Sequence, residues 1–221
     1  YAYFETKNRV SSEYADHLSV VGKLKANQIS EWRRERLADA VRYAQGPALV
    51  NPVFNYLRNP GDETAKSNVL YMLALNRKCD FYANTMLVST NGHLLLEATP
   101  TGLSFTEPSI SAVRHAIATR APAFSPIFKC EAGHTHIDTV APIFDASGQL
   151  AALFVLRADT SQSLYPIIRF WPTGSATAET LLLERDGDSI VFLNEPRFRR
   201  GHTPNMRLPL DRQFVETQAV L

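Results

Sequence analysis

The hydrophobic positions in the first third of the chain recur with the period of a helix. Between residues 13 and 44 the apolar positions fall at steps near 3.6 residues: Tyr14, Leu18, Val21, Leu24, Ile29 and Trp32. The other face is rich in Lys, Arg and Glu, and Gly46-Pro47 stops the pattern. The sequence therefore predicts one long amphipathic helix, which we expect to pack across a sheet.

The period then shortens, after a stretch of shorter helices expected over residues 51–80. Strand formers dominate residues 81–89 and 93–97, on either side of the hairpin signal Asn91-Gly92. A helix over 108–120 and strands over 123–129, 135–144 and 149–158 follow. The pattern predicts an α+β fold in which the long helix covers one face of a PAS-like five-stranded antiparallel sheet.

A second, shorter run of the same elements follows a connecting helix over residues 161–171. It reads as a hairpin over 179–194, a polar loop with Arg197, Arg199 and Arg200, and a helix from Asp211. We therefore divide the chain into residues 1–60 (long helix and turn), 61–171 (a complete module) and 172–221 (an incomplete second module).

Composition narrows the class of protein. The 221 residues are 45% hydrophobic with a net charge of +1, which suits a globular domain and argues against an extended basic surface for nucleic acid. The apolar runs are too short to cross a bilayer, and the start without Met reads as a piece of something longer. No Gly-rich phosphate loop, nucleophile elbow or kinase signature is present, so we expect no enzymatic activity and no cofactor in this chain.

The two cysteines have neither the number nor the spacing of a zinc site. Cys79 and Cys130 are expected at the same end of the sheet but one or two strands apart. A disulfide needs Cα atoms within about 7 Å, so we predict that they do not form one.

Several stretches in order carry a family resemblance: Lys25-Ala-Asn-Gln-Ile-Ser-Glu-Trp-Arg-Arg-Glu-Arg36, His136-Ile-Asp-Thr-Val-Ala-Pro-Ile-Phe144, Leu156-Arg-Ala-Asp159, Leu164-Tyr-Pro166 and Phe192-Leu-Asn-Glu195. Together with the element order, they resemble the tandem Cache (PDC) domains, PAS-like sensor folds found outside the membrane. The first stretch looks like the opening helix of such sensors when they are fused to histidine kinases or diguanylate cyclases.

The resemblance implies a location and a role. The chain would be the periplasmic, ligand-sensing part of a two-component sensor histidine kinase in the inner membrane, with a diguanylate cyclase as the alternative parent. Residues 61–171 would be the membrane-distal module with the ligand pocket, and residues 172–221 the membrane-proximal one. The parent would be a homodimer anchored by transmembrane helices outside this chain. Many receptors of this family that bind amino acids carry an Arg-x-Trp-Tyr motif, which is absent here, so an amino-acid ligand is not implied.

One polar run suggests a site. His134, His136 and Asp138 alternate along a predicted strand and so share one sheet face. If the 145–148 turn pairs Phe144 with Gln149, His136 faces Arg157 and His134 faces Asp159. This polar end, with an apolar stretch beyond it, is typical of the floor of a pocket for a small polar or zwitterionic ligand.

Other readings of the same residues stay open. Cross-strand charge pairs on a solvated strand end would look the same. The spacing His-x-His-x-Asp also resembles a metal-dependent hydrolase that would use His134, His136 and Asp138, although Thr139 stands where that family has a further His. A dimerisation module without a ligand is a third possibility. Tyr82, on the same predicted strand face as Asn84, and Arg114, on the 108–120 helix, complete the predicted ligand-binding set.

Overall fold

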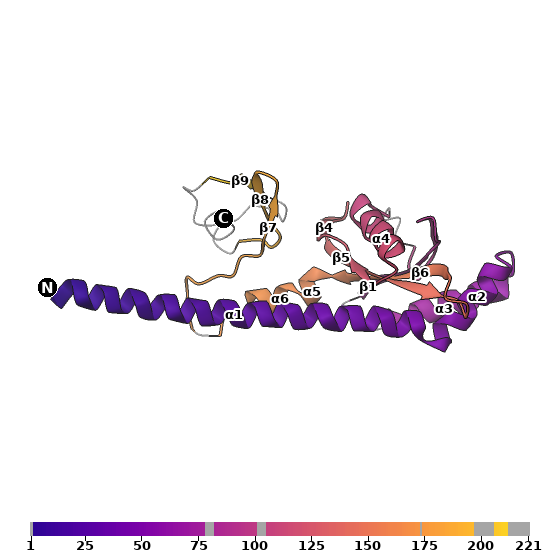
Figure 1. Cartoon of the computed structure of the whole chain (residues 1–221), viewed down its shortest axis with the longest axis horizontal. Coiled ribbons are helices and arrows are strands. Elements are labelled where there is room, and N and C mark those ends of the chain that lie inside the picture. Colours follow the sequence, from indigo (N-terminus) through magenta and orange to yellow (C-terminus); the bar gives the residue numbers. More distant parts are fainter. Residues whose placement is uncertain (1, 78–81, 101–104, 173, 197–205, 212–221) are drawn as a thin grey trace.

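A single helix runs along almost the whole length of the molecule (Figure 1). In this computed structural model, which describes residues 2–77, 82–100, 105–172, 174–196 and 206–211, helix α1 spans Ala2–Gln45. Its 44 residues make it about 66 Å long at a rise of about 1.5 Å per residue. The predicted stop is confirmed, because Pro47 opens the next helix; the start lies eleven residues before the predicted Glu13.

Two short helices turn the chain back at the end of α1. Helix α2 spans Pro47–Arg58 and α3 spans Glu63–Asn76. The Asp62 carboxylate caps α3 by accepting hydrogen bonds from the backbone N–H of Thr64 and Ala65, at 2.8 and 3.2 Å. The predicted turn at 59–62 is thus confirmed.

The first sheet is antiparallel, in the order β2-β1-β6-β5-β3, with β4 also paired to β5. Its strands are β1 (Tyr82–Val88), β2 (Leu94–Glu97), β3 (Ala123–Phe124), β4 (Phe128–Lys129), β5 (Thr135–Phe144) and β6 (Leu150–Asp159). The single strand predicted over 123–129 is wrong: Ser125 and Pro126 interrupt it. Proline has no N–H to give to a ladder, which accounts for the break.

Helix α1 covers one face of this sheet, as predicted. Apolar side chains of its second half, including Trp32, Ala40 and Ala44, share a core with Ile137, Ala141, Ile143, Phe154 and Leu156. Trp32 is only 5% exposed and stacks on Phe124, with ring centroids 6.2 Å apart. The alternation of β5 and β6 therefore assigned the helix-covered face correctly.

Helix α4 (Glu107–Thr119) covers the opposite face. Ala112, Val113 and Ala116 of this helix pack on Val140, Leu153 and Val155. The sheet is thus covered on both sides, and the polar side chains directly beneath α4, such as Asp138 and Arg157, are buried.

The first half of α1 differs from the prediction. Tyr14 and Leu18 of the apolar stripe are 67% and 55% exposed, and Val21 is the first buried residue of the stripe. The stripe was expected to be covered by the sheet from Glu13 onward, but the sheet does not extend that far along the helix (Figure 1).

Helices α5 (Thr160–Ser163) and α6 (Tyr165–Arg169) replace the one predicted connecting helix. They lie beside the middle of α1 (Figure 1). There the buried Lys25 ammonium donates to the carbonyl oxygens of Ile167, at 2.5 Å, and Phe170. Burial lowers the pKa of Lys25. This contact ties α1 to the segment that leads to the second sheet.

The second sheet is separate and small, in the order β7-β8-β9. The predicted hairpin is confirmed as β7 (Leu183–Asp186) and β8 (Ser189–Phe192), and β9 (Arg207–Pro209) adds a strand where a loop was expected. Arg197, Arg199 and Arg200 and the helix predicted after Asp211 lie outside the described residues. The division at residues 60 and 171 into two modules stays a prediction.

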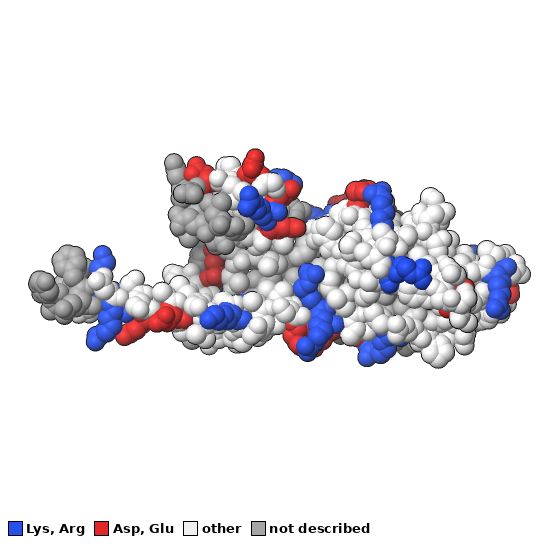
Figure 2. Space-filling view, in the orientation of Figure 1, with Lys and Arg blue, Asp and Glu red and all other residues white. Residues whose placement is uncertain are grey.

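Three further observations concern the described part of the chain. None of its helices is both long and apolar enough to cross a membrane. Acidic and basic side chains are interspersed on the face shown in Figure 2, without a large patch of one sign. Cys130 is buried, while Cys79 lies outside the described residues, so the absence of a disulfide stays a prediction.

Candidate ligand-binding site

A buried ion pair lies on the sheet face beneath α4. Arg157 of β6 donates from Nε and Nη2 to the two carboxylate oxygens of Asp138 on β5, at 2.8 and 2.9 Å. Their side chains are 2% and 0% exposed. A bidentate guanidinium–carboxylate pair fixes the orientation of both groups and compensates part of the cost of burying their charges.

The pairing register explains why these two residues meet. The predicted register, with Phe144 opposite Gln149 and His136 opposite Arg157, is wrong. A bulge between Ile143 and Phe144 shifts the ladder, so that Asp138 lies opposite Arg157 and His136 lies opposite Asp159. The shift is an even number of residues, so each side chain keeps its predicted face.

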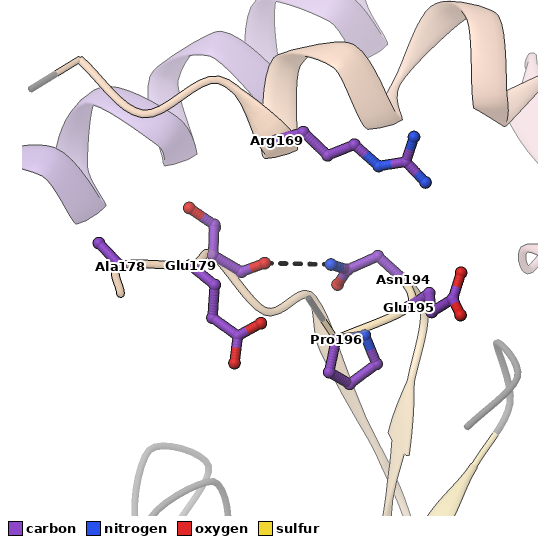
Figure 3. Close-up of a pocket in the computed structure, with 7 residues that line it drawn as sticks. Arg169, Ala178, Glu179, Asn194, Glu195 and Pro196 are labelled. Carbon is purple, nitrogen blue, oxygen red and sulfur yellow. Dashed lines mark hydrogen bonds between the residues drawn. The ribbon is translucent and has the colours of Figure 1, made fainter. Parts of the chain in front are cut away.

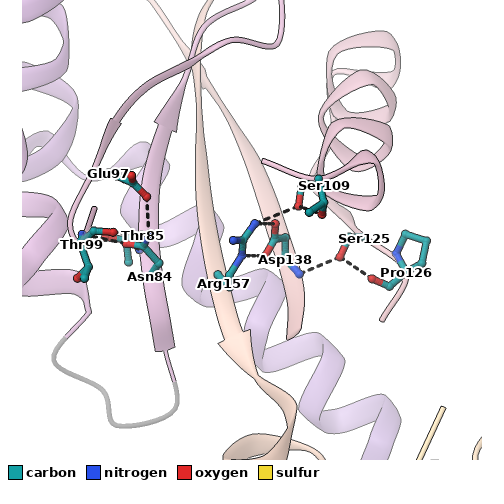
Figure 4. A network of polar contacts seen from close by, with 10 residues as sticks. Asn84, Thr85, Glu97, Thr99, Ser109, Ser125, Pro126, Asp138 and Arg157 are labelled. Atoms are coloured by element: carbon teal, nitrogen blue, oxygen red, sulfur yellow. Dashed lines mark hydrogen bonds and ion pairs between the residues drawn. The ribbon is translucent and has the colours of Figure 1, made fainter. Parts of the chain in front are cut away.

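Two serines connect this pair to the elements around it (Figure 4). Arg157 Nη2 also donates to the Ser109 hydroxyl of α4, at 3.1 Å. The Ser125 hydroxyl, between β3 and β4, accepts from the backbone N–H of Asp138 at 2.9 Å and donates to the Pro126 carbonyl at 2.7 Å. Helix α4, strands β5 and β6, and the segment between β3 and β4 are thus joined through one polar centre.

A second polar group lies on the neighbouring strand β1, where Asn84 is opposite Arg157. The Asn84 side chain donates to Glu97 Oε2 at 2.9 Å and to the Thr99 carbonyl at 3.0 Å, and it accepts from the backbone N–H of Thr99 (Figure 4). Asn84 therefore holds the end of β2, next to the segment that leads to α4.

His136 is the least satisfied polar side chain of the site. It is 4% exposed, and both of its ring nitrogens are buried without a hydrogen-bond partner among the described residues. Its ring centroid lies 5.9 Å from that of Phe128. Burial, and then the positive charge of Arg157, lower the pKa of His136, so the ring is neutral in the folded protein near pH 7.

The Arg157 guanidinium also has a hydrogen-bond donor that the described part of the protein does not use. Burial lowers the pKa of its guanidinium, but the hydrogen bonds and charge of Asp138 together outweigh burial and raise the pKa above its ordinary value. Among the described residues, Nη1 makes no hydrogen bond, and the guanidinium carbon lies 5.1 Å from the centroid of the Phe128 ring. Buried polar atoms without partners, such as the two ring nitrogens of the neighbouring His136, are rare in folded proteins and indicate a place for water or a ligand.

The other predicted residues lie apart from this centre. Asp159 caps α5 by accepting from the backbone N–H of Ser161, at 2.8 Å. His134 is exposed, just before β5. Arg114 is exposed on α4 and pairs with Glu107 at 2.8 Å. None of these three contacts the Arg157–Asp138 pair in the described structure.

Tyr82 is on the wrong face for the predicted site. A bulge between Tyr82 and Asn84 sends the two side chains to opposite faces, although the alternation predicted one. The Tyr82 hydroxyl donates to Asp39 Oδ2 of α1 at 2.9 Å, within the core under that helix. Burial, with the nearby negative charge of Asp39, raises the pKa of Tyr82 despite the opposing effect of Arg36.

The geometry does not favour a metal centre here. Within the described ranges, no three His, Cys, Asp or Glu side chains are grouped so that they could hold a metal ion. Both oxygens of Asp138 are engaged by Arg157, so the aspartate of the His-x-His-x-Asp run is used for an ion pair instead.

Comparisons with known proteins identify the fold. No protein-family profile and no curated protein sequence matches the chain. Among solved structures, it is similar to the sensory domain of the Campylobacter jejuni chemoreceptor Tlp3 with isoleucine bound (TM-score 0.53, 14% identity, covering 67% of this chain and 60% of that one). It is also similar to the ligand-binding domain of the Pseudomonas aeruginosa amino-acid chemoreceptor PctC in complex with GABA (TM-score 0.50, 20% identity, covering 70% and 64%).

The chain has the α+β fold of these Cache-type sensor domains, as the resemblance implied. The matched region spans less than two thirds of the length of either chemoreceptor chain.

Proposed function

We propose that this chain is the extracytoplasmic ligand-sensing part of a transmembrane signalling receptor, and that its ligand binds between α4 and the sheet, against Arg157. The observation that carries the proposal is the pair of buried, unsatisfied ring nitrogens of His136, near the Arg157 guanidinium, whose Nη1 makes no hydrogen bond among the described residues. The shared fold with sensor domains of chemoreceptors supports it.

The chemistry of these atoms favours a small polar or zwitterionic molecule. A free guanidinium N–H suits a carboxylate, and a neutral imidazole can donate through one nitrogen and accept through the other. The nearby apolar side chains of α4 and the sheet would meet the rest of the ligand. The similar solved structures hold isoleucine and GABA. This chain lacks the Arg-x-Trp-Tyr motif of many amino-acid receptors, so we do not propose an amino acid in particular.

Binding would require α4 to move away from the sheet. Arg157 and Asp138 are almost fully buried, and Ser109 of α4 holds the guanidinium. A ligand that takes over this hydrogen bond would favour a state in which α4 lies farther from the sheet, which is a population shift between two conformations. Strand β1 carries Asn84 on this face and Tyr82 on the opposite face, where the Tyr82 hydroxyl is hydrogen-bonded to Asp39 of α1. Strand β1 would therefore pass the change to α1.

The larger context follows the family resemblance. We propose a periplasmic location, a homodimeric parent anchored in the inner membrane, and a sensor histidine kinase as the output, with a diguanylate cyclase as the alternative. Residues 61–171 would be the membrane-distal module and 172–221 part of the membrane-proximal one. A chemoreceptor output is a further alternative, because the solved relatives belong to chemoreceptors.

A thermal-shift screen of small organic acids, amines and nucleobases tests the proposal, since a molecule that binds only the folded state raises Tm. A hit is then titrated calorimetrically against the double variant Asp138→Asn/Arg157→Gln, which removes the guanidinium without leaving a buried charge alone. Binding should be lost in this variant and kept in the control Arg114→Ala.

Three results would count against the proposal. A hit that binds the double variant as well as the wild type places the ligand elsewhere. A screen without hits favours a dimerisation module whose polar centre is purely structural. Zinc found in the purified protein at one ion per chain would favour the hydrolase alternative based on His134, His136 and Asp138.

A further inference from the structure

Two adjoining cavities lie where the first sheet, α6 and the second sheet meet. The larger, about 550 Å³, is lined by Arg169 of α6, residues 178–180 before β7 and residues 194–196 after β8. The smaller, about 290 Å³, is lined by residues of the β4–β5 turn and of α5 and α6, together with Glu195. Arg169 and Glu195 line both. We call the two cavities together the junction cleft.

The walls of the junction cleft are fixed by hydrogen bonds. The Tyr165 hydroxyl of α6 donates to the Leu193 carbonyl at 2.6 Å and joins α6 to the end of β8. The Asn194 side chain accepts from the backbone N–H of Leu182 at 2.6 Å. It also donates to the Thr180 carbonyl at 3.0 Å (Figure 3). These bonds fix α6, the segment before β7 and the segment after β8 relative to one another.

Three charged side chains of the cleft are left without a counter-charge among the described residues. Within the described part of the chain, Arg169, Lys129 and Glu195 have no ion-pair partner, and the Arg169 guanidinium lies over the Tyr165 ring, 5.9 Å from its centroid. In Figure 3, Arg169 extends along one side of the larger cavity, opposite Asn194 and Glu195. The Thr180 hydroxyl is buried and has no hydrogen-bond partner in the described structure.

The balance of charge favours an anion in the smaller cavity, whereas Glu179 adds a second carboxylate to the larger one. Lys129, Arg169 and His134 face the smaller cavity, against the single carboxylate Glu195. A cation would meet two fixed positive charges there, whereas a carboxylate or phosphate group would meet two strong donors without having to displace an existing partner.

From this arrangement we infer a second binding site, in the smaller cavity of the junction cleft, for a small anion with a carboxylate or phosphate group. Because its lining comes from both sides of the connection between the two sheets, an anion bound there would stabilise one relative placement of the sheets. This site is distinct from the proposed ligand site, since none of its lining residues belongs to the Arg157–Asp138 network.

Calorimetric titration of the whole chain with inorganic phosphate and with acetate, at constant ionic strength, tests the inference. At least one probe should bind in the millimolar range or more tightly, and the one that binds distinguishes a phosphate site from a carboxylate site. Arg169→Gln should weaken binding about tenfold or more, because it removes a charged donor. Lys129→Gln should weaken it as well. The matched control is Arg58→Gln, an exposed arginine at the end of α2, which should bind like the wild type.

The two proposals can fail separately. Binding of the probe should persist in Asp138→Asn/Arg157→Gln, in which the proposed ligand site is disabled. If neither probe binds, or if Arg169→Gln and Lys129→Gln bind as the wild type does, the junction cleft is not an anion site. If instead binding is lost only in Asp138→Asn/Arg157→Gln, the anion belongs to the site under α4 and the junction-cleft inference is wrong.

Discussion

The Tyr82 hydroxyl donates a hydrogen bond of 2.9 Å to Asp39, and this bond joins strand β1 to helix α1. Asp39 also pairs with Arg36 at 3.2 Å and with Arg42. Strand β1 pairs with β6, the strand that carries Arg157. The neighbour of the Arg157 strand is therefore linked directly to the long helix through a charged acceptor.

Replacing Tyr82 with Phe should lower the free energy of unfolding by about 1–3 kcal/mol, because a buried hydrogen bond to a charged group is lost while the ring remains. Urea denaturation monitored by circular dichroism measures this change. Tyr71→Phe is the matched control, since Tyr71 is 64% exposed, and it should change stability by less than about 0.5 kcal/mol. Equal effects at the two positions would show that the Tyr82–Asp39 bond does not stabilise the fold.

The Arg157–Asp138 pair should show strong coupling. Asp138→Asn alone leaves a guanidinium buried without its counter-charge and should cost about 3–5 kcal/mol of stability, and Arg157→Gln should cost a similar amount. The double variant should be clearly more stable than the sum of the two single losses predicts. A double-mutant cycle from denaturation curves measures the coupling, and strictly additive losses would contradict the buried pair.

His136 should make the fold sensitive to mild acid. Its pKa is lowered in the folded protein, so below its unfolded value of about 6.5 the unfolded chain takes up a proton that the folded chain does not. The free energy of unfolding should therefore fall as the pH drops from about 7 through that value. The loss reaches its full extent below the folded pKa.

The variant His136→Leu isolates this effect, because it has no imidazole to protonate at that place. The difference in stability between pH 7 and pH 5 should be smaller in His136→Leu than in the wild type. His115→Asn, at an exposed position of α4, should keep the dependence of the wild type. An unchanged pH dependence in His136→Leu would assign the acid sensitivity to other groups.

The packing of α1 can be tested by fluorescence, because the chain has two tryptophans. Trp32 is buried and Trp171 is partly exposed. The variant Trp171→Phe should emit at shorter wavelength and resist quenching by iodide, whereas Trp32→Phe should show the red-shifted, quenchable emission of the remaining tryptophan. Equal quenching of the two variants would mean that α1 does not cover the sheet at Trp32.

The sequence predicted the parts of the fold that depend on periodicity. The alternation of β5 and β6 assigned Ile137, Ala141 and Phe154 to the face under α1, and Asp138 and Arg157 to the other. The register itself was mispredicted, because nothing in residues 144–150 marks the bulge. Pro126, by contrast, was a readable signal for the break between β3 and β4. The exposure of Tyr14 and Leu18 could not be anticipated, since a periodic stripe does not say where its partner surface ends.

The candidate site was predicted only in part. Arg157, Asp138 and His136 were selected by alternation, but Ser109 and Ser125 were not, although each contacts the ion pair or the strand that carries it. Short hydroxyl side chains occur at helix starts and turns for local reasons, so their role depends on contacts distant in sequence. Asn84, a polar residue inside an apolar strand, was the clearer signal for a buried polar centre.

The length of α1 has a mechanical consequence. The helix is held at Trp32 and at Lys25, while Tyr14 and Leu18 lie well beyond those contacts. A rigid rod pivoting at Lys25 would carry Ala2, about 35 Å away at about 1.5 Å per residue, through about 3 Å for a tilt of only about 5°. In that geometry helix α1 would act as a lever: a sub-ångström displacement at Trp32, about 10 Å from the pivot at about 1.5 Å per residue, would be enlarged about threefold at Ala2.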